Sequence, residues 1–213
     1  MNKLLPGIAA MAAVVVASNI LVQFLILDGL LTWGAFTYPF AFLVTDLMNR
    51  VYGPADARRV VYFGFVTGVV CSLIGSQIML EGDGYTYPAV AFRIAVGSGI
   101  AFLVAQLVDV FVFDRLRAGI WWRAPLASTI VGSVLDTALF FTIAFSASVP
   151  FFSEAANGDI SWAWDVAPLL TFGSDAPLWV SLALADWIVK LSVALVALIP
   201  FRIFVHRIFD QGA

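Results

Sequence analysis

Charged side chains inside long apolar runs are the first chemical signal in this sequence. Such a charge costs about 2.5–3.5 kcal/mol at the centre of a lipid-facing helix. None of these side chains is therefore expected to face lipid, and charges kept in such segments typically mark a binding site or an ion pathway. Six residues belong to this set: Asp46, Arg93, Asp109, Asp136, Asp186 and Lys190.

Three of these charges fall near the middle of their apolar runs, where a long side chain cannot reach water. They are Asp136, Asp186 and Lys190. Asp186 and Lys190 are four residues apart, which places them on one face of a helix and lets them pair. A purely structural ion pair is the competing interpretation. We favour a functional polar site, because charged residues inside membrane spans usually mark one.

The other three charges lie nearer the ends of their runs. Asp46 and Asp109 are within about a turn of the end that is assigned below to the cytoplasm. A structural role at the interface fits them as well as a functional one. Arg93 lies about a turn inside the opposite end, where its side chain could extend outward to water.

Amide and aromatic side chains add neutral donors, acceptors and flat surfaces. Asn19 and Gln23 are four residues apart, and such a pair more often joins helices than binds a ligand. Trp33 and Phe36 precede Pro39, which removes a backbone donor and should kink or break the helix. Packing is the common use of an aromatic stripe, but aromatic faces beside a broken helix also suit a planar ring.

The composition indicates the elements that must position these groups. Of the 213 residues 62% are hydrophobic and 12% are charged, and the mean hydropathy is +0.99, which rules out a soluble globular protein. A bilayer-crossing helix needs about 20 apolar residues. We predict an all-α integral membrane protein: one domain over residues 1–213, a compact bundle of six transmembrane helices with the second kinked or broken. The predicted spans are Ile8–Asp28, Leu30–Asn49, Val60–Leu80, Ala89–Phe113, Leu126–Val149 and Leu178–Phe201.

The distribution of basic residues predicts the orientation. Basic residues lie at the N-terminus, at the C-terminus and in every second loop between the predicted spans. The other loops carry no Lys or Arg, and the long acidic segment Pro150–Pro177 is one of them. By the positive-inside rule, both termini are cytoplasmic and this segment lies outside. The first apolar run is too long for the core of a signal peptide, so we expect it to stay uncleaved. The nine basic residues on the cytoplasmic side are Lys3, Arg50, Arg58, Arg59, Arg115, Arg117, Arg123, Arg202 and Arg207.

Several classes of function are disfavoured by what the chain contains. A single cysteine, Cys71, and a single histidine, His206, argue against a disulfide, a metal site and a histidine-based catalytic centre. The formal charge of -3 argues against a nucleic-acid partner. An intramembrane enzyme would need a dyad of Lys190 with Ser181 or Ser192, and we predict no catalytic or cofactor site.

Together, these groups predict one cavity near the midplane that binds a small, planar ligand through several hydrogen bonds. The lipid bilayer and this ligand are the expected partners. The residues alone lead to a small-molecule transporter and select no substrate. The expected lining residues are Asn19, Gln23, Trp33, Phe36, Arg93, Gln106, Asp136, Asp186 and Lys190.

Short strings distributed over all six predicted spans resemble the queuosine precursor transporter family, also called a vitamin uptake family. The resemblance runs in order from about residue 18 to residue 190. Tyr38 departs from the family pattern, where phenylalanine is expected, and Pro150–Pro177 matches nothing in it. The strings include Ser18-Asn19, Leu21–Gln23, Thr32–Phe36, Tyr38–Phe40, Thr45–Leu47, Ala57–Arg59, Arg93–Ala95, Gln106, Asp109-Val110, Phe113–Arg117, Trp121-Trp122, Ala127–Thr129, Asp136-Thr137, Phe140-Phe141, Asp186 and Lys190.

The resemblance implies a multi-pass protein of the bacterial inner membrane. It implies import of 7-cyano-7-deazaguanine and 7-aminomethyl-7-deazaguanine for queuosine synthesis by secondary transport. The nearest alternative is a substrate-capture subunit of an energy-coupling-factor importer, for which Ala9 and Ala13 could form a docking stripe. A receptor or assembly protein that does not transport is a third class. Gly64 and Gly68 predict a close helix contact, either within the chain or in a homodimer.

Overall fold

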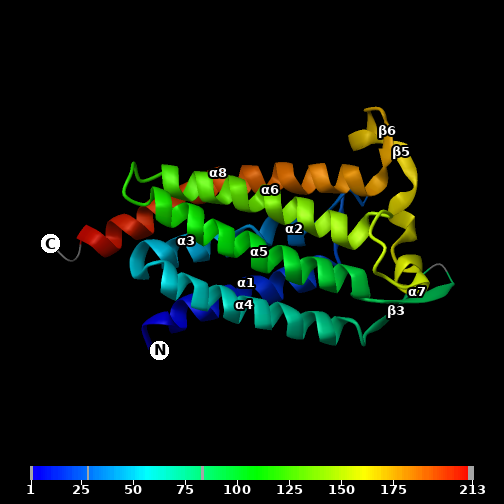
Figure 1. Ribbon diagram of the computed structural model, residues 1–213, viewed down its shortest axis with the longest axis horizontal. Coiled ribbons are helices and arrows are strands. Elements are labelled where there is room, and N and C mark those ends of the chain that lie inside the picture. Colours follow the sequence, from blue (N-terminus) through cyan, green and yellow to red (C-terminus); the bar gives the residue numbers. More distant parts are fainter. Residues whose placement is uncertain (1, 28, 83, 211–213) are drawn as a thin grey trace.

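The computed structural model describes residues 2–27, 29–82 and 84–210. Six helices lie lengthwise in one bundle, and the two ends of the described chain lie at the same end of it (Figure 1). These helices are α1 (Leu5–Leu21), α3 (Phe40–Tyr52), α4 (Pro54–Gly75), α5 (Phe92–Leu116), α6 (Arg123–Phe145) and α8 (Leu178–Asp210).

Short helices and hairpins connect the long helices. The helical pieces are η1 (Asn2–Leu4), α2 (Gly34–Thr37), α7 (Glu154–Gly158), η2 (Ser161–Trp164) and η3 (Leu169–Thr171). The strands form three antiparallel pairs: β1 (Leu25–Ile26) with β2 (Leu31–Thr32), β3 (Met79–Gly82) with β4 (Tyr85–Pro88), and β5 (Val166–Pro168) with β6 (Asp175–Pro177).

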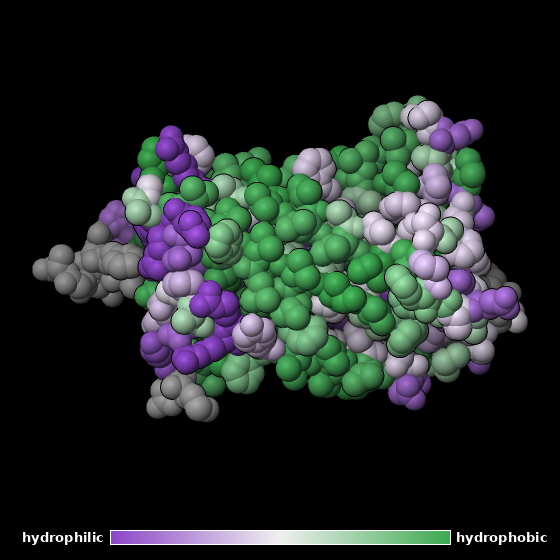
Figure 2. Space-filling model, viewed as in Figure 1, coloured by the Kyte–Doolittle hydropathy of each residue, from purple (hydrophilic) through white to green (hydrophobic). Residues whose placement is uncertain are grey.

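Four helices are long and apolar enough to cross a bilayer among the described residues. They are α4, α5, α6 and the Leu178–Arg207 part of α8, while α1 is apolar but shorter. Figure 2 shows an apolar band across the middle of the visible face, with hydrophilic residues at both ends. Large apolar side chains of the long helices, such as Ile74, Phe111 and Val196, are exposed, where lipid would cover them. The chain is therefore a multi-pass membrane protein by its structure.

The first two predicted spans differ most from the structure. Helix α1 ends at Leu21, and the chain then forms the β1–β2 hairpin through a turn with positive φ at Leu27 and Gly29. Asp28, the predicted end of the first span, lies outside the described residues. The second span is divided into β2, α2 and α3, so no single helix covers Leu30–Asn49.

The division between α2 and α3 falls at Pro39, as the sequence predicts. Proline has no backbone N–H to donate to the preceding turn. The amides of Ala41 and Phe42 bond to the carbonyls of Tyr38 and Pro39, three residues back, so a tight turn separates the helices. The side chain of Tyr38 is held at this break.

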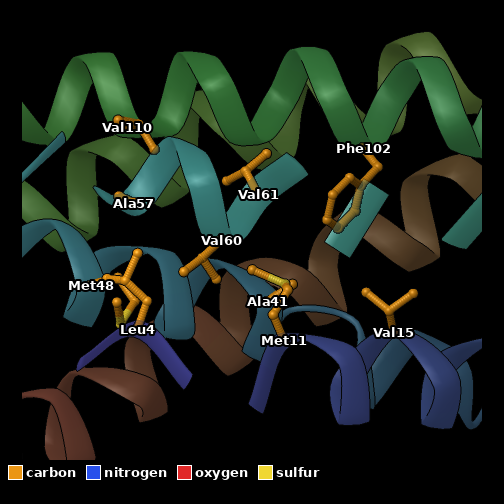
Figure 3. Close-up of a cluster of buried hydrophobic side chains, with 10 residues drawn as sticks. All are labelled: Leu4, Met11, Val15, Ala41, Met48, Ala57, Val60, Val61, Phe102 and Val110. Carbon is orange, nitrogen blue, oxygen red and sulfur yellow. The ribbon is translucent and has the colours of Figure 1, made fainter. Parts of the chain in front are cut away.

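The largest apolar cluster lies where α1, α3, α4 and α5 meet (Figure 3). Gly64 of α4 makes the close approach possible, because a Cβ there would come within 2.6 Å of Met11 and 2.9 Å of Phe102. Gly68 faces Val15 of α1. The glycine pair therefore forms a contact within one chain, and the predicted homodimer gains no support from it.

The segment between α6 and α8 folds back over one end of the bundle. Ile160 and Ala163 are fully buried among Ala91, Phe141 and Phe145. The indole N–H of Trp164 donates to the carbonyl of Phe145 at 2.6 Å. This packing fixes the start of α5 and the end of α6 relative to each other.

Candidate functional site

A buried ion-pair network joins α6 to α8. Lys190 Nζ lies 2.6 Å from Asp136 Oδ2 and also pairs with Asp186 Oδ2. The exposed fractions of the side chains are 4% for Lys190, 5% for Asp136 and 15% for Asp186. The predicted pairing of Asp186 with Lys190 is present, and the structure adds Asp136 as a second partner of the same ammonium group.

Two hydroxyl groups complete this network. Thr137 Oγ1 lies 3.2 Å from Lys190 Nζ, which donates to it, and itself donates to Asp186 Oδ2 at 3.0 Å. Tyr38 Oη donates to Asp136 Oδ1 at 2.8 Å. The Lys190 ammonium lies 5.4 Å from the centre of the Tyr38 ring. We call Tyr38, Asp136, Thr137, Asp186 and Lys190 the ionic cluster.

Local structure explains how these five side chains meet. Asp136 and Thr137 are consecutive on α6, and Asp186 and Lys190 are one turn apart on α8. Tyr38 enters from the break between α2 and α3, and its ring packs edge to face on Phe42 and Phe102. An unbroken second helix would not present this side chain in the same way.

The ionic cluster carries a formal surplus of negative charge, with two carboxylates for one ammonium. Both oxygens of Asp136 are bound, one by Tyr38 and one by Lys190. The described residues offer no hydrogen bond to Asp186 Oδ1, and Asp186 is the most exposed of the three charged members. Asp186 can therefore accept hydrogen bonds from a ligand while Asp136 keeps Lys190 in place.

Arg93 lies apart from the ionic cluster and does not extend into water. It is fully buried and donates to the carbonyls of Ile143 and Ser146 and to Asn157 Oδ1. Its guanidinium also stacks on the Phe152 ring at 4.7 Å. Arg93 thus ties α5 to the end of α6 and to α7, in place of the outward extension to water that its position allows.

The remaining predicted residues also lie apart from the ionic cluster. Gln106 is fully buried and accepts from Thr45 Oγ1 at 2.6 Å. Asn19 donates to the carbonyl of Val15 in its own helix. Gln23 is exposed and donates to the carbonyl of Ala89, which connects the end of α1 to the start of α5.

The two predicted aromatic residues lie at the surface of the structure. Trp33 and Phe36 are 53% and 36% exposed. Their ring centres are 5.9 Å apart, so they contact each other. Tyr38, two residues beyond Phe36, is the aromatic side chain that reaches the buried charges.

Sequence reasoning missed the two hydroxyl groups of the ionic cluster. Each had a signal: Tyr38 departs from the phenylalanine of the family pattern beside Pro39, and Thr137 directly follows Asp136. Among the residues that the structure describes, no three His, Cys, Asp or Glu side chains gather as a metal site.

Apolar membrane-length helices around a buried, hydrogen-bonded set of charges place the chain in the class of multi-pass membrane proteins with a polar site inside the bundle. The sequence matches the family model described as "Putative vitamin uptake transporter" over residues 32–205. The chain belongs to this family, that of the queuosine precursor transporters.

Curated relatives carry the same description. The chain is 35% identical to the "Queuosine precursor transporter" of Escherichia coli over 88% of its own length and 79% of that protein. It is 33% identical to the "Probable queuosine precursor transporter" of Haemophilus influenzae, over 79% of this chain and 66% of the relative. The protein of that name in Bacillus subtilis is 27% identical over 78% of this chain and 68% of the relative. No solved structure gives a significant match.

Proposed function

We propose that the protein imports the 7-deazaguanine precursors of queuosine across the bacterial inner membrane, and that the ionic cluster is the binding site. The substrates are 7-cyano-7-deazaguanine and 7-aminomethyl-7-deazaguanine, and transport is of the secondary type. The observation that carries the proposal is the buried Asp136–Lys190–Asp186 network. An ion pair that only stabilises the fold needs one carboxylate for one ammonium group, and here a second carboxylate is present.

The chemistry of a deazaguanine ring matches the groups in the ionic cluster. Its N1–H and exocyclic amine are neighbouring donors, which one carboxylate can accept together. Asp186 fits this role because its Oδ1 is free of hydrogen bonds from the described residues. Lys190 either steadies the Asp186 carboxylate or releases its bond to Thr137 and donates to the carbonyl oxygen of the ring. The Tyr38 ring beside it offers an aromatic surface.

The orientation follows from the basic end of the molecule. Arg50 donates to the carbonyl of Arg117 there, and Arg59 pairs with Asp56. The same end is strongly hydrophilic in Figure 2 and holds both ends of the described chain. By the positive-inside rule this end is cytoplasmic, so the α7 and β5–β6 segment faces outward.

Uptake into liposomes tests the proposal directly. Purified protein is reconstituted without other proteins, and accumulation of radiolabelled 7-cyano-7-deazaguanine is measured. We expect saturable uptake by the wild type. Asp186→Asn should abolish it, because the amide group places a donor opposite the donors of the ring. Asp165→Asn is the matched control, since Asp165 is exposed in the outer segment.

Each alternative gives a different outcome. Binding without uptake until an ATPase partner is supplied would favour the capture subunit, whose docking stripe would be the exposed Ala9 and Ala13 on α1. Uptake by Asp186→Asn at near the wild-type rate would show that the substrate binds elsewhere.

A further inference from the structure

A second pair of buried acids lies outside the ionic cluster. Asp46 of α3 and Asp109 of α5 are 2% and 0% exposed. Both face the same stretch of α6: Ser128 and Thr129 donate to Asp46, and a Cβ at Gly132, one turn further on, would lie 3.4 Å from the Cβ of Asp109. We call Asp46 and Asp109 the carboxyl pair.

The hydrogen bonds to the carboxyl pair are unequal. Ser128 Oγ donates to Asp46 Oδ1 at 3.1 Å, and Thr129 Oγ1 donates to Asp46 Oδ2 at 3.4 Å. Neither oxygen of Asp109 accepts a bond from an N–H or hydroxyl group of the described residues. A fully buried carboxyl group without a donor is costly unless it holds a proton. A carboxyl that holds a proton can itself donate to its neighbour.

The cations on the two helices that carry the pair are engaged elsewhere. On α3, Arg50 donates to the carbonyl of Arg117. On α5, Arg115 lies over the Phe111 ring, while Asp114 pairs with Arg117. Arg93, at the far end of α5, anchors the outer segment as described above.

The helices packed against α3 and α5 supply no ion pair either. Among the described residues, no Lys or Arg pairs with or donates to Asp46 or Asp109. The α1 helix has no titratable side chain, and Lys190 belongs to the ionic cluster. The other charged or titratable groups of α3, α4, α6 and α8 are bound elsewhere, exposed, or far along their helices: Tyr52, Asp56, Arg58, Arg59, Tyr62, Cys71, Arg123, Asp136, Asp186, Arg202, His206 and Arg207.

A small cavity lies beside Asp46. Pro39, Phe42 and Thr129 line it together with apolar residues of α8, and it has room for about one water molecule. Asp46 and Pro39 both line this cavity, so it connects Asp46 to the proline break that presents Tyr38. A water molecule in it would lie beside the Asp46 carboxyl.

The carboxyl pair and the ionic cluster are both hydrogen-bonded to α6. Thr129 and Asp136 lie two turns apart on α6, and the first bonds Asp46 while the second bonds Tyr38. Asp46 and Tyr38 lie on either side of Pro39. Any movement of α3 against α6 therefore changes both sites at once.

We propose that the carboxyl pair carries one proton that moves inward with each substrate molecule, so that the protein is a proton symporter. In the structure Asp109 holds this proton and directs it toward Asp46 as a hydrogen bond, because both Asp46 oxygens already accept bonds from α6. When α3 and α6 separate toward the cytoplasm, the proton leaves to water and both carboxylates ionise. The empty pair takes up a proton from the outer side before the helices close again.

This inference rests on the proposed function, and one experiment separates the two. Liposomes holding the purified protein are clamped at zero membrane potential with valinomycin and potassium. An inward gradient of about one pH unit is applied, with neutral 7-cyano-7-deazaguanine as the radiolabelled probe. One proton per substrate then supports up to about tenfold accumulation, because each pH unit is a tenfold ratio of proton activity.

The variants make the assignment specific. Asp109→Asn imitates the protonated carboxyl. This variant should still exchange internal for external substrate, but under the gradient its ratio of internal to external substrate concentration should stay at about one. Asp46→Asn is the second variant and should behave alike. Asp114→Asn, which changes an exposed acid of the same helix, should keep the wild-type accumulation.

The wild type alone can also overturn the proposal, whatever the folding of the variants. A pH dye inside the liposomes should report acidification when substrate is added outside. Exchange without a response to the pH gradient, or accumulation driven by a sodium gradient instead, would refute proton symport and leave the substrate assignment intact. If the wild type shows neither binding nor exchange of the substrate, the proposed function itself is refuted.

Discussion

Replacing Lys190 by methionine would leave two carboxylates buried side by side. Lys190 is the one cation that the described residues place in contact with Asp136 and Asp186, and its side chain is 4% exposed. Methionine keeps most of the length and bulk of the side chain, so packing changes little. Removing one partner of a buried ion pair costs about 3–5 kcal/mol, because the remaining charge stays desolvated.

The structure predicts an asymmetry between the members of the network. Asp186→Asn leaves Lys190 paired with Asp136 at 2.6 Å, and Thr137 can still bond to the new amide. This variant should therefore lose about 1 kcal/mol or less, in the range of a single exchanged hydrogen bond. Lys190→Met should lose several times as much, although both changes remove the same Asp186–Lys190 pair.

The same asymmetry predicts which second substitution restores the free energy of unfolding in a variant that lacks Lys190. A double Asp186→Ala, Lys190→Ala variant leaves Asp136 with Tyr38 as its hydrogen-bond donor and should regain little. Lys190→Met combined with Asp136→Asn leaves Asp186, the more exposed acid, with Thr137 as donor. This double variant should regain most of the loss.

Thermal unfolding of the purified protein in detergent, followed by circular dichroism, measures these differences. For a chain of this size, a loss of about 3–5 kcal/mol corresponds to a fall in Tm of roughly 6–20 °C. Equal Tm values for Lys190→Met and Asp186→Asn would refute the shared-lysine arrangement. So would full recovery in the double alanine variant.

Three further changes test other parts of the structure. Tyr38→Phe removes the donor to Asp136 and should cost about 1–3 kcal/mol in unfolding free energy while uptake persists, because the aromatic ring and the Asp186 carboxylate both stay in place; complete loss of uptake would contradict this. Arg93→Gln removes most of the donors that hold the outer segment, so limited proteolysis should cleave residues 150–177 faster than in the wild type, and an unchanged rate would exclude the anchor. Gly64→Val forces side-chain atoms into Met11, which lies within 2.6 Å of the added Cβ, and should lower the Tm in a monomer as well as in any dimer.

The amino-acid sequence determined the membrane class and much of the secondary structure. Long, mainly apolar runs predicted α4, α5, α6 and α8, because a bilayer requires helices of that length and composition. Pro39 predicted the break in the second segment, since a missing N–H acts locally. The spacing of Asp186 and Lys190 predicted their pairing for the same reason: neighbours one turn apart meet on any helix.

Only the tertiary structure decided which distant side chains meet. Asp136 reaches Lys190 because α6 packs on α8, and Asp46 reaches Asp109 and Ser128 because α3, α5 and α6 converge. Close contacts between helices determine which faces pack together. Gly97 of α5, for example, lies against the backbone of α6. Helical periodicity says which residues share a face, but hydropathy is nearly the same all round α5, α6 and α8. The choice of facing partners therefore depends on packing between residues far apart in the chain, and that choice placed Arg93 among the carbonyls at the end of α6 and Tyr38 in the ionic cluster.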